Sequence, residues 1–124
     1  MNWQKNRILV VDDDADILRV FKSILEKEGY KVETAETGKD ALKKIKKAKF
    51  SVYLVDVKLP DIDRTELLLK IPNDLKAIKI VVTGFSTDDI GKKAADYGAD
   101  DFLVKPVKAN ELIATVIERL GTTR

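Results

Sequence analysis

Short runs of β-branched and other apolar residues alternate along the chain with longer segments in which apolar positions recur every three or four residues. Continuous apolar runs are typical of strands that are covered on both faces of a parallel sheet. The three- and four-residue spacing predicts amphipathic helices. No segment rich in serine, glycine or proline interrupts the alternation, so the pattern predicts one domain, with a structured core at about residues 7–120 of 1–124.

Five strand–helix units follow from this pattern. A parallel sheet with right-handed crossovers and helices on both faces is expected, because each strand is followed by a helix. A closed barrel of eight such units would need about twice this length, which leaves an open, doubly wound α/β sheet. The predicted strands are residues 8–11, 31–35, 52–55, 78–82 and 102–104, of which the polar 31–35 is an outer strand, and the predicted helices are about residues 17–25, 38–48, 64–71, 88–97 and 112–120.

The composition restricts the chemistry that the chain can perform. It contains no Cys and no His, which excludes a disulfide framework, a thiolate nucleophile, an imidazole metal ligand and a phosphohistidine within the chain. Lys and Arg number 23 against 21 Asp and Glu, and this small, evenly spread net charge of +2 predicts neither nucleic acid nor a membrane surface as a partner. The lysine-rich helix at 38–48 is interpreted as a solvated face. No signal peptide or long apolar run is evident, so we expect a soluble, cytoplasmic protein.

Polar residues capable of chemistry stand at four of the five predicted strand ends. Asp12 and Asp13 follow the first strand, Asp56 the third, Thr83 the fourth and Lys105 the fifth. The carboxyl ends of parallel strands share one edge of the sheet. If the first and third strands are neighbours, three carboxylates crowd together there and need a cation to remain ionised. A hard divalent ion, Mg²⁺ rather than Ca²⁺, suits this set. With the hydroxyl and the ammonium, these groups suit capture of a phosphoryl group on an aspartate.

The segments ILVVDDD, VYLVDVKLPDID, VVTG and GADDFLVKP, in this order and spacing, resemble the receiver domain of two-component response regulators. The resemblance covers about residues 7–120. It implies a flavodoxin-like sheet with the strand order 2-1-3-4-5. It also implies a signalling switch that promotes only its own phosphorylation and slow dephosphorylation, rather than an enzyme.

The resemblance assigns a role to each residue of the predicted site. Asp56 matches the phosphoacceptor, which would receive its phosphoryl group from a sensor histidine kinase or a phosphotransfer protein. The switching surface would be the fourth helix, fifth strand and fifth helix, which would bind a downstream protein. The Mg²⁺ ligands would be Asp12, Asp13, Asp56 and the backbone carbonyl of Lys58. Thr83 and Lys105 would contact the phosphoryl group, and Thr83 and Phe102 would be the switch residues. The peptide bond between Lys105 and Pro106 would be cis.

At several positions this chain differs from the residues that the family often has, or carries a residue that affects the expected properties of the phosphorylated domain. Arg64 stands where the family often has a glycine. Lys58 and Phe85 occupy the two positions that tune the phosphoryl lifetime in this family, and their bulk predicts slow autodephosphorylation. Thr115 and Thr122 replace arginines through which related regulators pair, so a monomer or a weak phosphorylation-dependent dimer is expected.

Alternatives to these roles remain open at this point. Asp14 suits a helix cap, and Phe102 suits a core position as well as a switch. A phosphohydrolase would use similar magnesium chemistry, but Lys58 stands where its general acid is expected. The chain also suits an interaction module that works without phosphorylation, and either a stand-alone regulator or the receiver of a longer protein.

Overall fold

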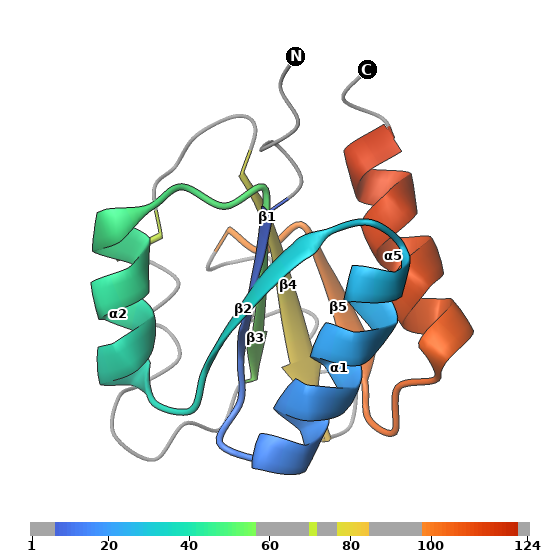
Figure 1. Cartoon of the computed structure of the whole chain (residues 1–124). Helices are drawn as coiled ribbons and strands as arrows, with labels where there is room; N and C mark the ends of the chain where they lie inside the picture. Colours follow the sequence, from blue (N-terminus) through green and yellow to red (C-terminus); the bar gives the residue numbers. More distant parts are fainter. Residues whose placement is uncertain (1–6, 57–69, 72–76, 85–97, 122–124) are drawn as a thin grey trace.

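Figure 1 shows the computed structural model of the chain, which describes residues 7–56, 70–71, 77–84 and 98–121. The predicted helix at 88–97 and nearly all of that at 64–71 lie outside these residues. No helix in the described ranges is both long and apolar enough to cross a bilayer. The strands are β1 (Arg7–Val11), β2 (Lys31–Ala35), β3 (Val52–Asp56), β4 (Ile78–Thr83) and β5 (Asp101–Val104), and the helices are α1 (Ala15–Lys27), α2 (Gly38–Lys47) and α5 (Ala109–Gly121).

The five strands form one parallel sheet in the order β2-β1-β3-β4-β5. This order confirms the predicted doubly wound topology and the outer position of β2. The central strands β1 and β3 are the continuously apolar ones, and every residue of β3 is buried. Both strands are covered on two faces, which explains why their sequences do not alternate between apolar and polar residues.

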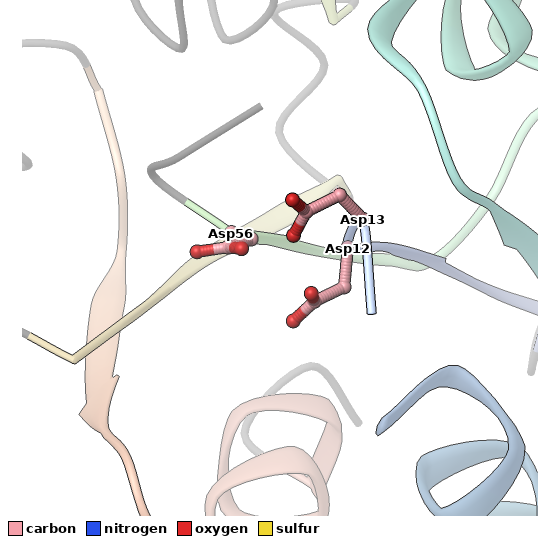
Figure 2. A group of neighbouring side chains, drawn as sticks. All are labelled: Asp12, Asp13 and Asp56. Carbon is pink, nitrogen blue, oxygen red and sulfur yellow. The ribbon is translucent and has the colours of Figure 1, made fainter. Parts of the chain in front are cut away.

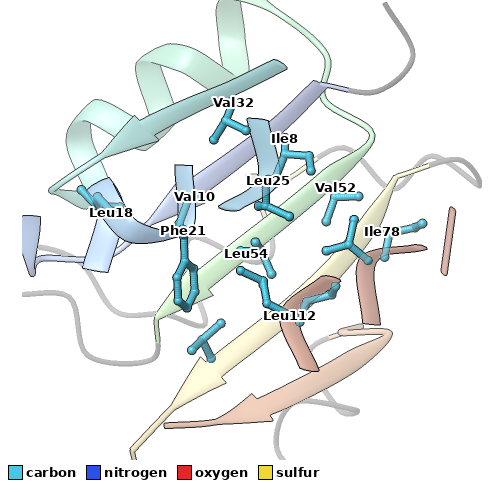
Figure 3. Close-up of a cluster of buried hydrophobic side chains, with 13 residues drawn as sticks. Ile8, Val10, Leu18, Phe21, Leu25, Val32, Val52, Leu54, Ile78 and Leu112 are labelled. Carbon is cyan, nitrogen blue, oxygen red and sulfur yellow. The ribbon is translucent and has the colours of Figure 1, made fainter. Parts of the chain in front are cut away.

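Two cores lie on the two sides of the sheet. Alternate residues of β1 face opposite sides, because side-chain direction reverses at each step along a strand. Ile8 and Val10 pack with residues of α1 and α5 in the cluster that Figure 3 shows, whereas Leu9 and Val11 pack on the side of α2. Helices therefore cover both faces, as predicted. The first cluster comprises Ile8, Val10, Leu18, Phe21, Leu25, Val32, Val52, Leu54, Ile78, Ile80, Val82, Leu112 and Val116.

Local signals in the sequence set the ends of the helices. The Asp14 carboxylate accepts hydrogen bonds from the backbone N–H groups of Asp16 at 2.9 Å and Ile17 at 3.4 Å, so the N-terminal cap of α1 is confirmed. Gly29 and Gly98 have φ values of 96° and 83°, a left-handed conformation that favours glycine. Gly29 thereby ends the α1 segment and turns the chain into β2.

Replacing Leu54 with Ala tests the importance of the central strand. Leu54 is fully buried on β3, so we expect Leu54→Ala to lower the free energy of unfolding by about 2–5 kcal/mol. Val20→Ala is the control, because Val20 is 52% exposed on α1 and its truncation should change stability by less than about 1 kcal/mol. Urea unfolding followed by circular dichroism measures both. Equal effects of the two substitutions would contradict the packing described here.

Candidate functional site

The register between β1 and β3 brings two aspartates side by side. Val11 pairs with Val55, so Asp12 and Asp56, the next residues of their strands, lie next to each other at the carboxyl edge of the sheet. Both are buried, with relative exposures of 2% and 4%. Asp13 follows directly and is exposed. Figure 2 shows the three carboxylates gathered at the ends of the two strands, which is the arrangement that the sequence predicted.

One carboxylate oxygen from each of Asp12, Asp13 and Asp56 lies within 4.8 Å of the others. Three negative charges at this spacing repel one another strongly where water is partly excluded. The donor set consists of hard carboxylate oxygens and combines two buried groups with one that solvent reaches. It therefore fits Mg²⁺, which binds one or two carboxylates and keeps several waters.

Backbone hydrogen bonds hold Asp12 in place. Its N–H donates to the carbonyl of Ala35 on β2 at 3.1 Å, which extends the pairing of β1 and β2 by one residue. Its Oδ1 accepts from the N–H of Asp14 at 2.9 Å. The same turn thus orients the buried carboxylate and supplies the cap of α1. The Oδ2 atom is left to face the rest of the site.

Lys105 brings a positive charge to this edge from the end of β5. Its Nζ donates to Asp12 Oδ2 at 2.9 Å and lies 3.5 Å from Asp56 Oδ2. Burial by itself would lower the pKa of Lys105, but the hydrogen bond to Asp12 and the negative charges of Asp12 and Asp56 outweigh it and raise the pKa above the usual 10.5. The ammonium is therefore charged at neutral pH. Among the described residues of this cluster, three carboxylates face one ammonium, a deficit of two positive charges that one divalent cation would balance.

The structure describes some of the remaining predicted site residues and not others. Thr83 is the last residue of β4 and pairs in register with Val104, so its backbone lies at the same edge, one residue from the level of Lys105. The bond between Lys105 and Pro106 is cis, as the resemblance implies. Phe102 is half-buried and packs against the core on the α2 side of the sheet. Lys58 lies outside the described residues.

One contact network was not foreseen from the sequence. Asp101 Oδ1 accepts from the N–H of Phe102 at 2.9 Å, and Asp101 Oδ2 accepts from Nε of Arg119 on α5 at 3.3 Å. The carboxylate thus joins the backbone beside the aromatic residue to the last helix. No short-range pattern signals this pair, because its members are 18 positions apart and meet only when α5 packs beside β5.

Metal binding tests the carboxylate cluster directly. We expect Mg²⁺ to raise the unfolding temperature, because an ion that binds only the folded state stabilises it. Asp13→Asn should weaken Mg²⁺ binding by about tenfold or more, since it removes one charged ligand. Asp14→Asn is the matched control: it removes a charge one residue away, and Asn caps a helix as well as Asp does. Calorimetric titration and thermal unfolding with and without Mg²⁺ measure both. Equal Mg²⁺ affinities of the two variants would exclude Asp13 from the site.

Comparison with known proteins agrees with this geometry. A family model described as the response regulator receiver domain matches residues 8–117. The chain is 33% identical over 125 residues to the transcriptional regulatory protein ZraR of Klebsiella oxytoca, covering 100% of this chain and 28% of that protein. It is 35% identical over 111 residues to the response regulator ArlR of Staphylococcus aureus, covering 89% and 50%. The chain therefore spans half or less of the length of these relatives.

Solved structures show the same similarity. A CheY-like receiver domain protein from Methanospirillum hungatei JF-1 superposes with a TM-score of 0.86 at 42% identity, over 94% of each chain. The chemotaxis response regulator CheY4 of Vibrio cholerae superposes with a TM-score of 0.85 at 29% identity, over 92% of this chain and 98% of that one. The strand order, the acidic strand ends and the family match agree, and the chain belongs to the response regulator receiver domain family.

Proposed function

We propose that this domain is a phosphorylation-controlled switch of a two-component system, in which Asp56 accepts a phosphoryl group from a phosphohistidine on a partner protein. The observation that carries the proposal is the position of Asp56: a buried carboxylate at the end of β3, beside two further carboxylates and 3.5 Å from an ammonium. A buried carboxylate among like charges is unfavourable unless a cation or a ligand uses it. The partner would be a sensor histidine kinase or a phosphotransfer protein. Because these 124 residues contain no His, the phosphohistidine lies outside them.

In the proposed reaction, a carboxylate oxygen of Asp56 attacks the phosphorus atom of the donor. The new P–O bond forms as the P–N bond to the imidazole breaks, and the imidazole leaves with the electron pair of that bond. Lys105 offsets the negative charge that the phosphoryl group brings, from its position beside Asp56. Asp12, Asp13 and Asp56, with the backbone carbonyl of Lys58, would hold Mg²⁺, which when bound neutralises charge on the phosphoryl oxygens.

Phosphorylation would then change the charge balance at the edge of the sheet. An aspartyl phosphate carries nearly two negative charges and adds acceptor oxygens, so it competes with Asp12 for the Lys105 ammonium and offers the Thr83 hydroxyl a partner. In the proposal, Phe102 and β5 respond to this change. The described part of the switching surface includes two exposed apolar residues, Val104 at 37% on β5 and Ile117 at 45% on α5. Those residues suit contact with a downstream protein. Such a protein would shift the equilibrium between the inactive and the active conformation of the domain only as far as it binds one of them more tightly than the other.

In this role the domain carries a signal and does not turn over a substrate. Its only chemistry would be its own phosphorylation and slow dephosphorylation in the cytoplasm, as a monomer or as a weak phosphorylation-dependent dimer. A phosphorylation-independent interaction module would need neither the cation-binding cluster nor Lys105. A phosphohydrolase would need a second acid in place of Lys58.

Phosphorylation by a small donor tests the proposal. Incubation with acetyl phosphate and Mg²⁺ should add one phosphoryl group to the wild-type protein, measured by intact mass, because Asp56 and its cation site suffice for the transfer. Asp56→Asn should show no gain, and Asp14→Asn should be phosphorylated like the wild type, since it leaves the cluster intact. A wild-type protein that gains no mass, or a gain that survives Asp56→Asn, would refute the proposal. Sustained turnover of phosphate esters by the wild type, but not by Asp56→Asn, would favour the phosphohydrolase.

The lifetime of the phosphoryl group tests the sequence-based prediction for Lys58 and Phe85. Loss of the phosphoryl group from purified protein in Mg²⁺ should be slow, because a long cation and a bulky aromatic at these positions in the sequence are expected to obstruct the attacking water. Phe85→Ala should accelerate the loss several-fold, whereas Phe50→Leu, a change at the buried Phe50 outside the site, should not. A wild-type half-life of only seconds by phosphate-release or mass measurement would contradict the prediction.

A further inference from the structure

Within the part of the chain that the structure describes, the outer strand β2 has one row of backbone groups without a neighbouring strand. It is the first strand in the order β2-β1-β3-β4-β5, so only one of its sides is paired. Ala35 directs its carbonyl toward β1, where it accepts from the N–H of Asp12. Backbone direction alternates along a strand, so Val32 and Thr34 direct their N–H and C=O groups outward. An exposed edge of this kind is a template for pairing with another chain.

Two lysines reach this edge from helices on opposite faces of the sheet. Nζ of Lys22, on α1, donates to the carbonyl of Val32 at 3.3 Å. Nζ of Lys44, on α2, donates to the carbonyl of Thr34. The two outward carbonyls of the strand interior are therefore both occupied by ammonium groups.

A carboxylate one helical turn away orients each ammonium. Lys22 Nζ lies 3.4 Å from Oε2 of Glu26, and Lys44 Nζ lies 3.5 Å from Oδ2 of Asp40. Both are pairs at positions i and i+4, which lie on the same side of a helix. Each lysine is thus shared between the strand edge and an acid of its own helix. The same three-part arrangement occurs on both faces.

We propose that Lys22 and Lys44 close the β2 edge against pairing with a second copy of this chain. A second copy is the relevant partner because the outward N–H and C=O groups of Val32 and Thr34 would complement the same groups of another β2 across a two-fold axis. Pairing would have to displace both lysines from the carbonyls. Association of this domain is thereby left to other surfaces.

The double variant Lys22→Met, Lys44→Met tests this proposal. Methionine keeps the length and the helix propensity of the side chain but removes the donor and the charge. We expect the variant to self-associate at least about tenfold more tightly than the wild type, measured by sedimentation equilibrium over a range of concentrations. The matched control is Lys27→Met, Lys46→Met, which makes the same substitution at one exposed position on each of the two helices. The rescue variant Lys22→Arg, Lys44→Arg retains donors and should behave as the wild type.

A cysteine on the strand shows which surface associates. The chain has no Cys, so Thr34→Cys introduces a single thiol on β2. Oxidation should cross-link the Lys22→Met, Lys44→Met background and leave the control background monomeric. Equal association of the double variant and the control, or association of the double variant without cross-linking, would overturn the proposal. If the double variant fails to fold by circular dichroism, the single variants decide: intermediate association supports the closed edge, and none refutes it.

Discussion

Repulsion among the carboxylates of Asp12, Asp13 and Asp56 is the constraint around which the carboxyl edge of this sheet is organised. Two of the three are buried, where solvent cannot screen them, and their oxygens approach within 4.8 Å. Lys105 relieves part of this repulsion by binding Asp12 at 2.9 Å and approaching Asp56 at 3.5 Å. The remaining excess of negative charge makes the edge suited to bind a divalent cation. The function proposed for Asp56 uses the same imbalance that makes the site unfavourable on its own.

The apolar layers beneath the site make this arrangement possible. Central strands β1 and β3 are buried on both faces, and their register places Asp12 beside Asp56. Slippage of either strand would move a charged residue into an apolar layer, at a cost of several kcal/mol. The two cores therefore define the register, and the register positions the carboxylates. The packing that stabilises the core therefore also determines the geometry of the site.

Charged side chains also act away from the site, at positions where the backbone lacks a partner. Lys22 and Lys44 occupy the outward carbonyls of β2, and Asp101 joins the backbone of β5 to Arg119 on α5. Surface ion pairs alone contribute little to stability. Here the bonds matter for the groups that they occupy: a carbonyl bound to a lysine is not available to another strand, and the Asp101 carboxylate connects β5 to α5.

The sequence by itself determined the strands and helices that lie within the described residues, and their type. Continuous apolar runs identified β1 and β3, the largely apolar run at 78–82 identified β4, and the polar run identified β2 as an outer strand. Asp14 and Gly29 marked the ends of α1. It also predicted that the polar residues at the strand ends lie at one edge of the sheet, because a parallel sheet gathers those ends there. These residues are Asp12, Asp13, Asp56, Thr83 and Lys105. These inferences succeeded because each depends on spacing within a few residues or on a rule of topology.

Only the tertiary structure decided which charged groups meet. That Lys105 binds Asp12 more closely than Asp56 depends on a contact between residues 93 positions apart, which no local pattern encodes. The same holds for Lys44, whose helix was interpreted as a solvated face, and for Lys22, because helix packing brings both to the carbonyls of Val32 and Thr34. Long flexible side chains reach several partners, and the choice among them is made by the packing of helices against the sheet. The sequence therefore specified which residues make up the site, and the fold specified which of their charged groups contact one another.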